Sequence, residues 1–163
     1  MDAATMAALG ERLHAGQTLY GDDLGSFAQD AFASGILGMV WDEVSLGRAV
    51  AHIEPDQRHH QPYGIVHGGV WCSIVESLAS VAAALQVVQD GRFVVGVSNS
   101  TDFLRSHRTG RVDAVAEPIH VGRTQQLWQV VLTRADDGKA VARGQVRLQN
   151  VDPVALGSQE RHP

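Results

Sequence analysis

Cysteine is nearly absent from this chain of 163 residues, which contains Cys72 alone. A single cysteine excludes an internal disulfide and a zinc site built from several thiolates, and it fits a reducing compartment, so we expect a cytoplasmic protein. The N-terminus lacks the basic segment of a signal peptide, and we expect no apolar run long enough to cross a bilayer. The formal net charge of −5 argues against nucleic acid as the main partner. We therefore expect neither a membrane nor a nucleic-acid partner.

Several catalytic and cofactor-binding motifs are also missing. The chain has no G-x-S-x-G turn, no phosphate-binding P-loop and no G-x-G-x-x-G dinucleotide motif. His59, His60 and His67 are close in sequence, but their spacing fits no zinc pattern and no pair of carboxylates accompanies them. We therefore expect no metal and no cofactor.

What is present is the composition of an ordinary globular domain, with 44% hydrophobic and 19% charged residues. We predict an N-terminal extension over residues 1–35, one domain over 36–151 and a flexible tail over 152–163. The extension is weakly patterned, and we expect two short, loosely held helices in it, at 4–14 and 24–34. Alternating apolar residues and turn signals predict strands at 36–44, 48–55, 92–105, 111–122, 124–135 and 139–151.

A long helix is predicted between the second and third of these strands. From Gly68 to about Val88 apolar residues recur at helical spacing, and alanines fill much of the remainder. Because such a helix has almost no polar face, the sheet must cover most of it. The order of elements predicts an α+β fold in which one antiparallel sheet curls around one helix. Open edges of that sheet would tend to pair with another copy of the chain.

The stretch QPYGIVHGGVWCSIVESLAS, residues 61–80, places two glycines at the helix start and a carboxylate, Glu76, on an apolar helix. It resembles the signature of the PaaI-like acyl-CoA thioesterases, which have the hotdog fold and include 4-hydroxybenzoyl-CoA and 1,4-dihydroxy-2-naphthoyl-CoA thioesterases. The similarity extends over residues 36–151 and includes the blocks NSTDFLR, AEPIHVGRTQQLW and ARGQVRLQN. This resemblance implies hydrolysis of an acyl-CoA, with an aromatic or medium-to-long acyl group, to the free acid and coenzyme A.

The resemblance also implies a role for each matching residue. The backbone N–H of Gly68 would point at the thioester carbonyl, and Glu76 would be the catalytic carboxylate, acting as nucleophile or as general base. Gln61 and His67 would flank the carbonyl, and Ser80 would assist the carboxylate. The residues that would contact the substrate or its coenzyme A are Gly69, Asn99, Arg105, Arg123 and Thr124.

Helix geometry adds a constraint on this site. Gly68 and Glu76 are eight residues apart, which corresponds to about 12 Å of helical rise, too far for both to act on one thioester from the same chain. Two antiparallel copies of the helix would bring Gly68 of one chain to Glu76 of the other. We therefore expect a homo-oligomer, a dimer or a tetramer, with the site shared between subunits.

Other interpretations stay open at the level of sequence. A hotdog-fold hydratase or dehydratase acting on acyl thioesters, or a non-catalytic acyl-CoA-binding module, would share much of this pattern. Trp71, Tyr63 and Phe103 could line an acyl site or belong to the core. Arg108 and Arg111 are expected to be a solvated edge rather than a phosphate clamp.

Overall fold

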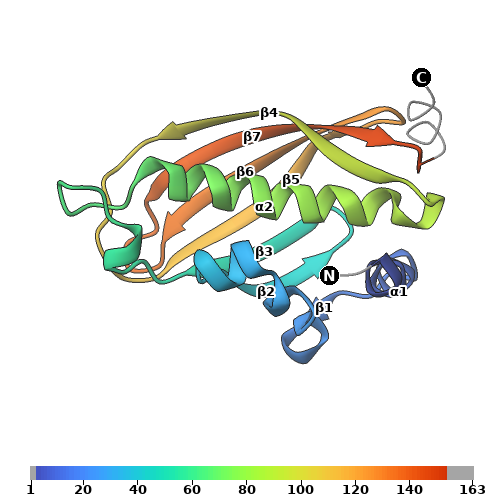
Figure 1. Ribbon diagram of the computed structural model, residues 1–163, viewed down its shortest axis with the longest axis horizontal. Helices are drawn as coiled ribbons and strands as arrows, with labels where there is room; N and C mark the ends of the chain where they lie inside the picture. Colours follow the sequence, from blue (N-terminus) through green and yellow to red (C-terminus); the bar gives the residue numbers. More distant parts are fainter. Residues whose placement is uncertain (1–2, 154–163) are drawn as a thin grey trace, which may run out of the picture.

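Seven antiparallel strands form one sheet that wraps around a single long helix, α2, in a computed structural model that describes residues 3–153 (Figure 1). The strand order is β1-β2-β3-β5-β6-β7-β4, so β1 and β4 form the two edges. The predicted α+β arrangement is confirmed. The strands are β1 (Leu19–Tyr20), β2 (Val40–Ser45), β3 (Arg48–Ile53), β4 (Phe93–Phe103), β5 (Val112–Val121), β6 (Gln125–Arg134) and β7 (Ala140–Val151).

Helix α2 (Gly68–Val87) forms the centre of the core, and its side chains at Ile74, Val75 and Leu78 are fully enclosed. The helix ends in a short 3-10 turn, Val88–Asp90, and the chain leaves it through Gly91, whose φ of 69° suits glycine. The segment Gly68–Asp90 is long and apolar enough to cross a membrane by length and composition alone. The expectation that no run reaches that length is therefore wrong. Half of its apolar 18-residue window is buried inside the fold, as is usual for a core helix.

The N-terminal part of the chain differs most from the sequence prediction. Helix α1 (Ala3–His14) is present, but residues 21–36 form three short turns of 3-10 and π-helix instead of one helix at 24–34. The first long strand begins at Val40 rather than at 36, because Asp30 caps the last of these turns and Gly38 then reverses the chain with a φ of 66°. The two-residue strand β1 was not predicted.

This N-terminal segment also packs more closely than the sequence suggests. The side chains of Leu13 and Phe27 are about 1% exposed and belong to the main core. His14 donates a hydrogen bond to the carbonyl of Leu85 (3.2 Å), and Gln89 donates one to the carbonyl of Ala7 (2.9 Å), so α1 is fastened to the end of α2. Of the predicted tail, residues 154–163 lie outside the described part of the chain.

A β-bulge in β4 determines which of its side chains face α2. The pairing of β4 with β7 shifts between Gly96 and Ser98, so one extra residue lies in β4 at this point. Simple alternation from Gly96 would turn Ser98, Ser100 and Asp102 toward the helix. The extra residue instead turns Asn99, Thr101 and Phe103 inward, opposite Val146, Gly144 and Ala142 of β7.

A buried glutamine fixes the second half of α2 to the sheet. Gln126 of β6 is 1% exposed, and its amide donates to the Ala83 carbonyl of α2 (3.1 Å) and to the Asn150 side chain (2.8 Å). Its oxygen accepts from the indole N–H of Trp128 (2.9 Å). All the hydrogen-bonding groups of a side chain that water cannot reach are therefore used.

We expect Gln126→Leu to lower the free energy of unfolding by about 2–4 kcal/mol, because it leaves the Trp128 and Asn150 groups buried without partners. Urea denaturation followed by circular dichroism measures this change. Gln129→Leu, on the same strand but only partly buried, is the matched control and should change stability by less than about 0.5 kcal/mol. Equal stability of the two variants would contradict the anchoring role.

Candidate active site

The two glycines at the start of α2 make room for two different neighbours. A Cβ at Gly68 would lie 2.7 Å from the ring of Phe103, and a Cβ at Gly69 would lie 2.9 Å from Nδ1 of His67. His67 is the N-cap, and its Nδ1 accepts a hydrogen bond from the Gly69 N–H (2.9 Å). The side chain predicted to flank a substrate carbonyl thus also caps its own helix.

The amide of Gly68 is the open donor at this helix end. Among the described residues none accepts a hydrogen bond from its N–H, whereas the next amide, that of Gly69, is bound to His67. The positive end of the helix dipole points out at the same place. This position favours a partly negative oxygen, such as a polarised carbonyl.

A cavity of about 220 Å³ opens beside this amide. It brings together three of the predicted site residues, Gln61, Gly68 and Arg105, and places Trp71 and Phe103 in its wall. The guanidinium of Arg105 is partly engaged, because it donates to the Ala140 carbonyl (2.7 Å). Tyr63 does not line this cavity and is 82% exposed. The other lining residues are Ile65, Val66, Leu104 and Ser106.

A second cavity, of about 420 Å³, borders the same helix tip through His67, Gly69, Val70 and Ser73. Phe32 and Leu37 form another part of its wall, so the N-terminal segment reaches the immediate surroundings of the tip. The side chain of Phe32 is half exposed in the single chain. The remaining lining residues are Arg58, His59 and His60.

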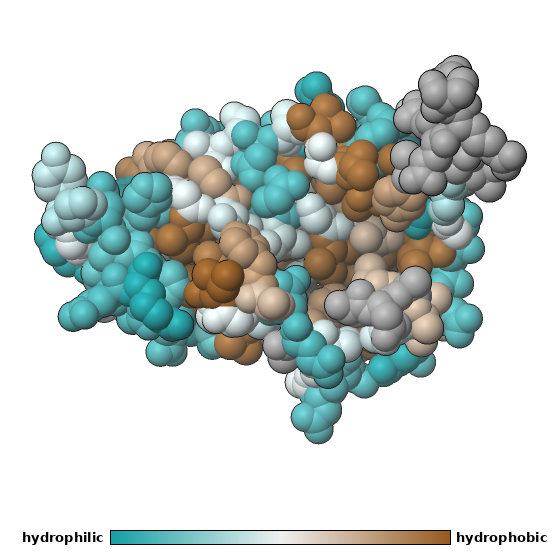
Figure 2. Space-filling view, in the orientation of Figure 1, coloured by the Kyte–Doolittle hydropathy of each residue, from teal (hydrophilic) through white to brown (hydrophobic). Residues whose placement is uncertain are grey.

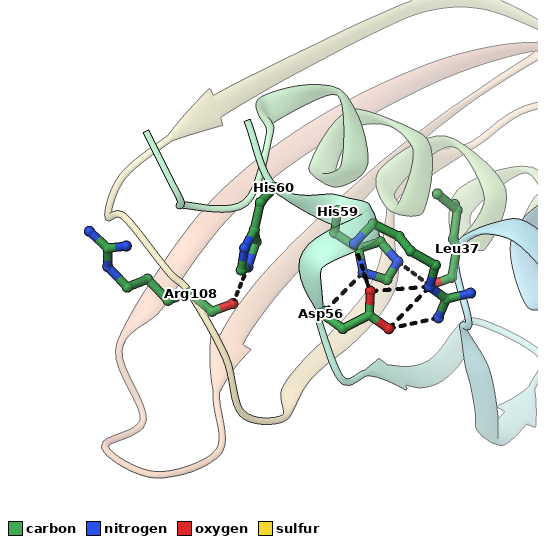
Figure 3. Close-up of polar contacts among 6 residues, drawn as sticks. Leu37, Asp56, His59, His60 and Arg108 are labelled. Atoms are coloured by element: carbon green, nitrogen blue, oxygen red, sulfur yellow. Dashed lines mark hydrogen bonds and ion pairs between the residues drawn. The ribbon is translucent and has the colours of Figure 1, made fainter. Parts of the chain in front are cut away.

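His59 and His60 have separate structural partners, as Figure 3 shows. Nε2 of buried His59 donates to the Leu37 carbonyl (3.1 Å), and its Nδ1 accepts from the Asp56 N–H (3.0 Å). His60 donates instead to the carbonyl of Arg108 (2.7 Å). Within residues 3–153 there is no group of three potential metal ligands.

The loop that carries these histidines is held by a charged cap. Hydrogen bonds donated by the side chain and the backbone N–H of Arg58 lower the pKa of Asp56 to about 2. Asp56 therefore stays ionised at neutral and mildly acidic pH and continues to cap the turn that leads to His59. Titration of Asp56 therefore does not move the histidines that line the second cavity between neutral and mildly acidic pH.

Glu76 lies two helical turns along α2 and is held by polar groups from two elements. Its Oε1 accepts from the Ser80 hydroxyl (3.3 Å), and its Oε2 accepts from the Asn99 amide of β4 (3.0 Å). A Cβ at Gly96 would be 2.7 Å from Oε1, so the carboxylate also packs against the backbone of β4. Glu76 is only partly buried.

The structure keeps the Gly68 amide and the Glu76 carboxylate apart within one chain. Strand β4 runs antiparallel to α2, with Phe103 at Gly68 and with Gly96 and Asn99 at Glu76. The two groups therefore occupy different positions along the same helix–strand seam. Neither of the two cavities at the helix tip is lined by Glu76.

The predicted coenzyme A contacts are also far apart within one chain. Arg105 follows the end of β4, whereas Arg123 lies near its start, where its carbonyl accepts from Arg92 (2.7 Å). Eleven residues of strand separate these points, which corresponds to about 35 Å. Thr124 lies beside Arg123, at the same end. Arg105 and Arg123 cannot contact one ligand phosphate from a single chain.

Asn99 is predicted from the sequence to contact the substrate, whereas no role is predicted for Thr101. Both residues belong to a part of β4 that is polar on its two faces, SNSTD, so alternation gives no signal for which side chains face the helix. The β4 bulge cannot be located from this polar pattern. Phe32 was missed for a different reason, because the segment around it has no regular apolar period.

The chain is similar to known proteins in both sequence and fold. A model of the thioesterase superfamily matches residues 63–141. The Rv1847 protein of Mycobacterium tuberculosis is 48% identical over 118 residues, which cover 71% of this chain and 84% of that protein. Its solved structure superposes with a TM-score of 0.71 at 46% identity, covering 73% of this chain and 95% of that chain.

Two further relatives carry names that state a reaction. A 1,4-dihydroxy-2-naphthoyl-CoA hydrolase of Listeria monocytogenes is 36% identical over 97 residues, 60% of this chain and 78% of that protein. The structure of thioesterase HI1161 from Haemophilus influenzae has a TM-score of 0.74 at 29% identity and covers 83% of this chain and 93% of that chain. This chain therefore belongs to the thioesterase superfamily, whose hotdog fold it has, and is a hydrolase of the thioester type.

Proposed function

We propose that this protein hydrolyses acyl-CoA thioesters at a site made by two copies of the chain, with the Gly68 amide of one copy and the Glu76 carboxylate of the other. One observation carries this proposal. Within residues 3–153 no group accepts a hydrogen bond from the Gly68 N–H, which lies at the helix tip beside a cavity. A carboxylate held by hydrogen bonds lies two turns away on the same helix, so one thioester could contact both kinds of group only if they came from two copies of the chain.

The exposed edge of the sheet supports pairing of two copies. Strand β4 is an edge strand, and its residues from 95 to 104 are exposed except for Thr101. They include the apolar side chains of Val95, Val97 and Phe103, which are 44–58% exposed. Figure 2 shows apolar surface gathered on the face where α2 lies. A second copy whose β4 pairs antiparallel with this one would cover that surface.

The same pairing would complete the site. A two-fold axis near the middle of β4 would bring Gly68 of one copy close to Glu76 of the other, because β4 runs antiparallel to α2. It would also bring the partner's Arg123 toward the end where Arg105 lies. The two arginines could then share the phosphates of one coenzyme A.

The chemistry follows from these groups. The Gly68 N–H and the helix dipole stabilise the negative charge that forms on the carbonyl oxygen. Glu76 either takes a proton from the attacking water or adds to the carbonyl carbon itself, forming an anhydride that water then opens. In the first route Glu76 passes the proton taken from water to the sulfur as the C–S bond breaks. In the second route the sulfur leaves as a thiolate when the anhydride forms, and it takes up a proton released when water opens the anhydride. Both routes release the acid and the free thiol.

The residues at the helix tip favour hydrolysis over hydration. A hydratase of this fold would need a histidine paired with an aspartate, but neither described cavity at the tip is lined by an aspartate. His67 caps its own helix, and His60 is bound to the Arg108 carbonyl. For the acyl group, we propose a bulky or aromatic class, because Phe32 and Leu37 line the larger cavity next to the tip.

Glu76→Gln should lower kcat by about 10²–10⁴-fold while the protein stays folded, because the amide has nearly the same shape but cannot act as base or nucleophile. Release of free thiol from a panel of aromatic and aliphatic acyl-CoAs measures the rate. Glu117→Gln, at an exposed carboxylate of β5, is the control and should match the wild type. A Glu76→Gln enzyme with normal turnover would remove the proposed function.

The role of the Gly68 amide can be separated from its small size. Gly68→Ala and Gly68→Pro both add carbon against the Phe103 ring, but only proline lacks the N–H. Proline is tolerated at the first position of a helix, and the extended backbone of His67 suits a residue before proline. We expect the proline variant to be about 10²–10³-fold slower in kcat than the alanine variant. Similar rates for the two would rule out the amide as oxyanion donor.

A mixing experiment tests whether the site is shared. Gly68→Pro and Glu76→Gln are each expected to be inactive alone, but a mixed dimer would contain one site with both defects and one intact site. Co-expression in equal amounts should therefore restore about one quarter of the wild-type activity, since half of the dimers are mixed. If isolated mixed dimers stay inactive, the amide and the carboxylate of a site come from the same chain.

A further inference from the structure

The catalytic carboxylate of the proposed function is held by a second residue that is itself held in place. Asn99 of β4 donates through Nδ2 to Oε2 of Glu76 (3.0 Å) and to the Cys72 carbonyl of α2 (3.0 Å). The hydroxyl of Thr101 donates to Oδ1 of the same amide (2.7 Å). The three side chains form a continuous line from the sheet to the carboxylate.

The two acceptors on α2 determine which way the Asn99 amide faces. The Cys72 carbonyl and the Glu76 carboxylate accept hydrogen bonds, so the NH₂ group must face α2. The amide oxygen then faces Thr101, whose hydroxyl donates to it. The reverse orientation would place the amide oxygen against two other oxygens, the Cys72 carbonyl and the Glu76 carboxylate. Both hydrogens of the NH₂ group are thus committed, one to the helix backbone and one to the carboxylate.

The backbone around this line is adapted to it. The β4 bulge turns Asn99 and Thr101 toward α2. Opposite Thr101, a Cβ at Gly144 would lie 2.6 Å from the threonine hydroxyl, and at Gly96 it would lie 2.7 Å from the Glu76 carboxylate. Two glycines therefore leave the space that the polar groups at both ends of the line occupy.

We propose that Asn99 and Thr101 are positioning residues for Glu76, with Thr101 acting only through Asn99. A glutamate has three rotatable side-chain bonds, and one bond from Ser80 at 3.3 Å leaves it much of that freedom. The Asn99 bond fixes the second oxygen and, through Cys72, ties it to the helix from which it projects. The carboxylate is then held ready for a thioester carbonyl at the neighbouring subunit's helix tip.

This proposal rests on the proposed function, and the experiment separates the two. Asn99→Leu, which has nearly the same shape, should lower kcat for acyl-CoA hydrolysis by about 10–100-fold with little change in KM. Thr101→Val should lower kcat by about tenfold, and Thr101→Ser, which keeps the hydroxyl, should restore it to within about twofold of the wild type. Thr133→Val, on the far strand β6, is the matched control and should leave both constants unchanged.

Combining the variants tests the order of action. If Thr101 acts only through Asn99, Thr101→Val should cause no further loss of kcat in the Asn99→Leu enzyme. Additive losses, a change in KM alone, or wild-type kcat in either single variant would overturn the proposal, provided that Glu76→Gln is inactive. If Glu76→Gln is active, the proposed function fails first. Thermal melting of each variant checks that a lost rate is not a lost fold.

Discussion

The seam between α2 and β4 is the contact on which the other features of this molecule depend. Helix and strand run antiparallel and approach closely at three glycines: Gly68 under the Phe103 ring, Gly96 under the Glu76 carboxylate, and Gly144 behind Val75 and Thr101. At each point a methyl group would lie less than 3 Å from one of these side chains, so the side chain or the backbone would have to shift. The seam therefore needs glycines on three different elements, α2, β4 and β7. The space that these glycines leave is occupied in part by polar side chains, Glu76 and Thr101.

A carboxylate on the most apolar helix of the protein is tolerable only at this seam. On the face of α2 that packs into the apolar core, Glu76 would lose its hydrating water and gain no hydrogen bonds in return, at a cost of several kcal/mol. At the seam it accepts hydrogen bonds from Ser80 and Asn99 and is only partly buried. A second copy covering β4 would remove the remaining water and strengthen these bonds. The stability of the charge and its reactivity thus depend on the same few polar contacts.

Much of the fold can be predicted from the sequence because its signals are local. The period of α2 and the alternation in β3, β5, β6 and β7 follow directly from residues that face one core. The N-terminal turns cannot be predicted in this way, since Asp30 and Gly38 act on a segment without periodicity, and Phe27 is buried by tertiary contacts alone. The expectation that no run reaches membrane length failed because α2 is apolar almost throughout, so this core helix has the length and composition of a spanning one.

The residues of the candidate site likewise differ in how far the sequence predicts them. The spacing of Gly68, Glu76 and Ser80 on one helix is visible in the sequence, because helix geometry translates directly into position. The partners on β4 are not visible, since a single inserted residue reverses the faces of a strand without leaving a mark in its composition. Asn99 could be associated with the site by resemblance, but its actual partner follows only from the pairing with β7.

The bulge in β4 also determines whether an apolar or a charged side chain lies next to the helix tip. In an unbulged strand, Asp102 instead of Phe103 would project toward the Gly68 amide. Its carboxylate would then occupy the very position that attracts a negatively polarised oxygen, and the enzyme would be inhibited by its own side chain. The extra residue sends Asp102 to the outer face, where Arg143 pairs opposite it in the sheet. One irregularity of the backbone thereby keeps the entrance to the helix tip free of competing anions.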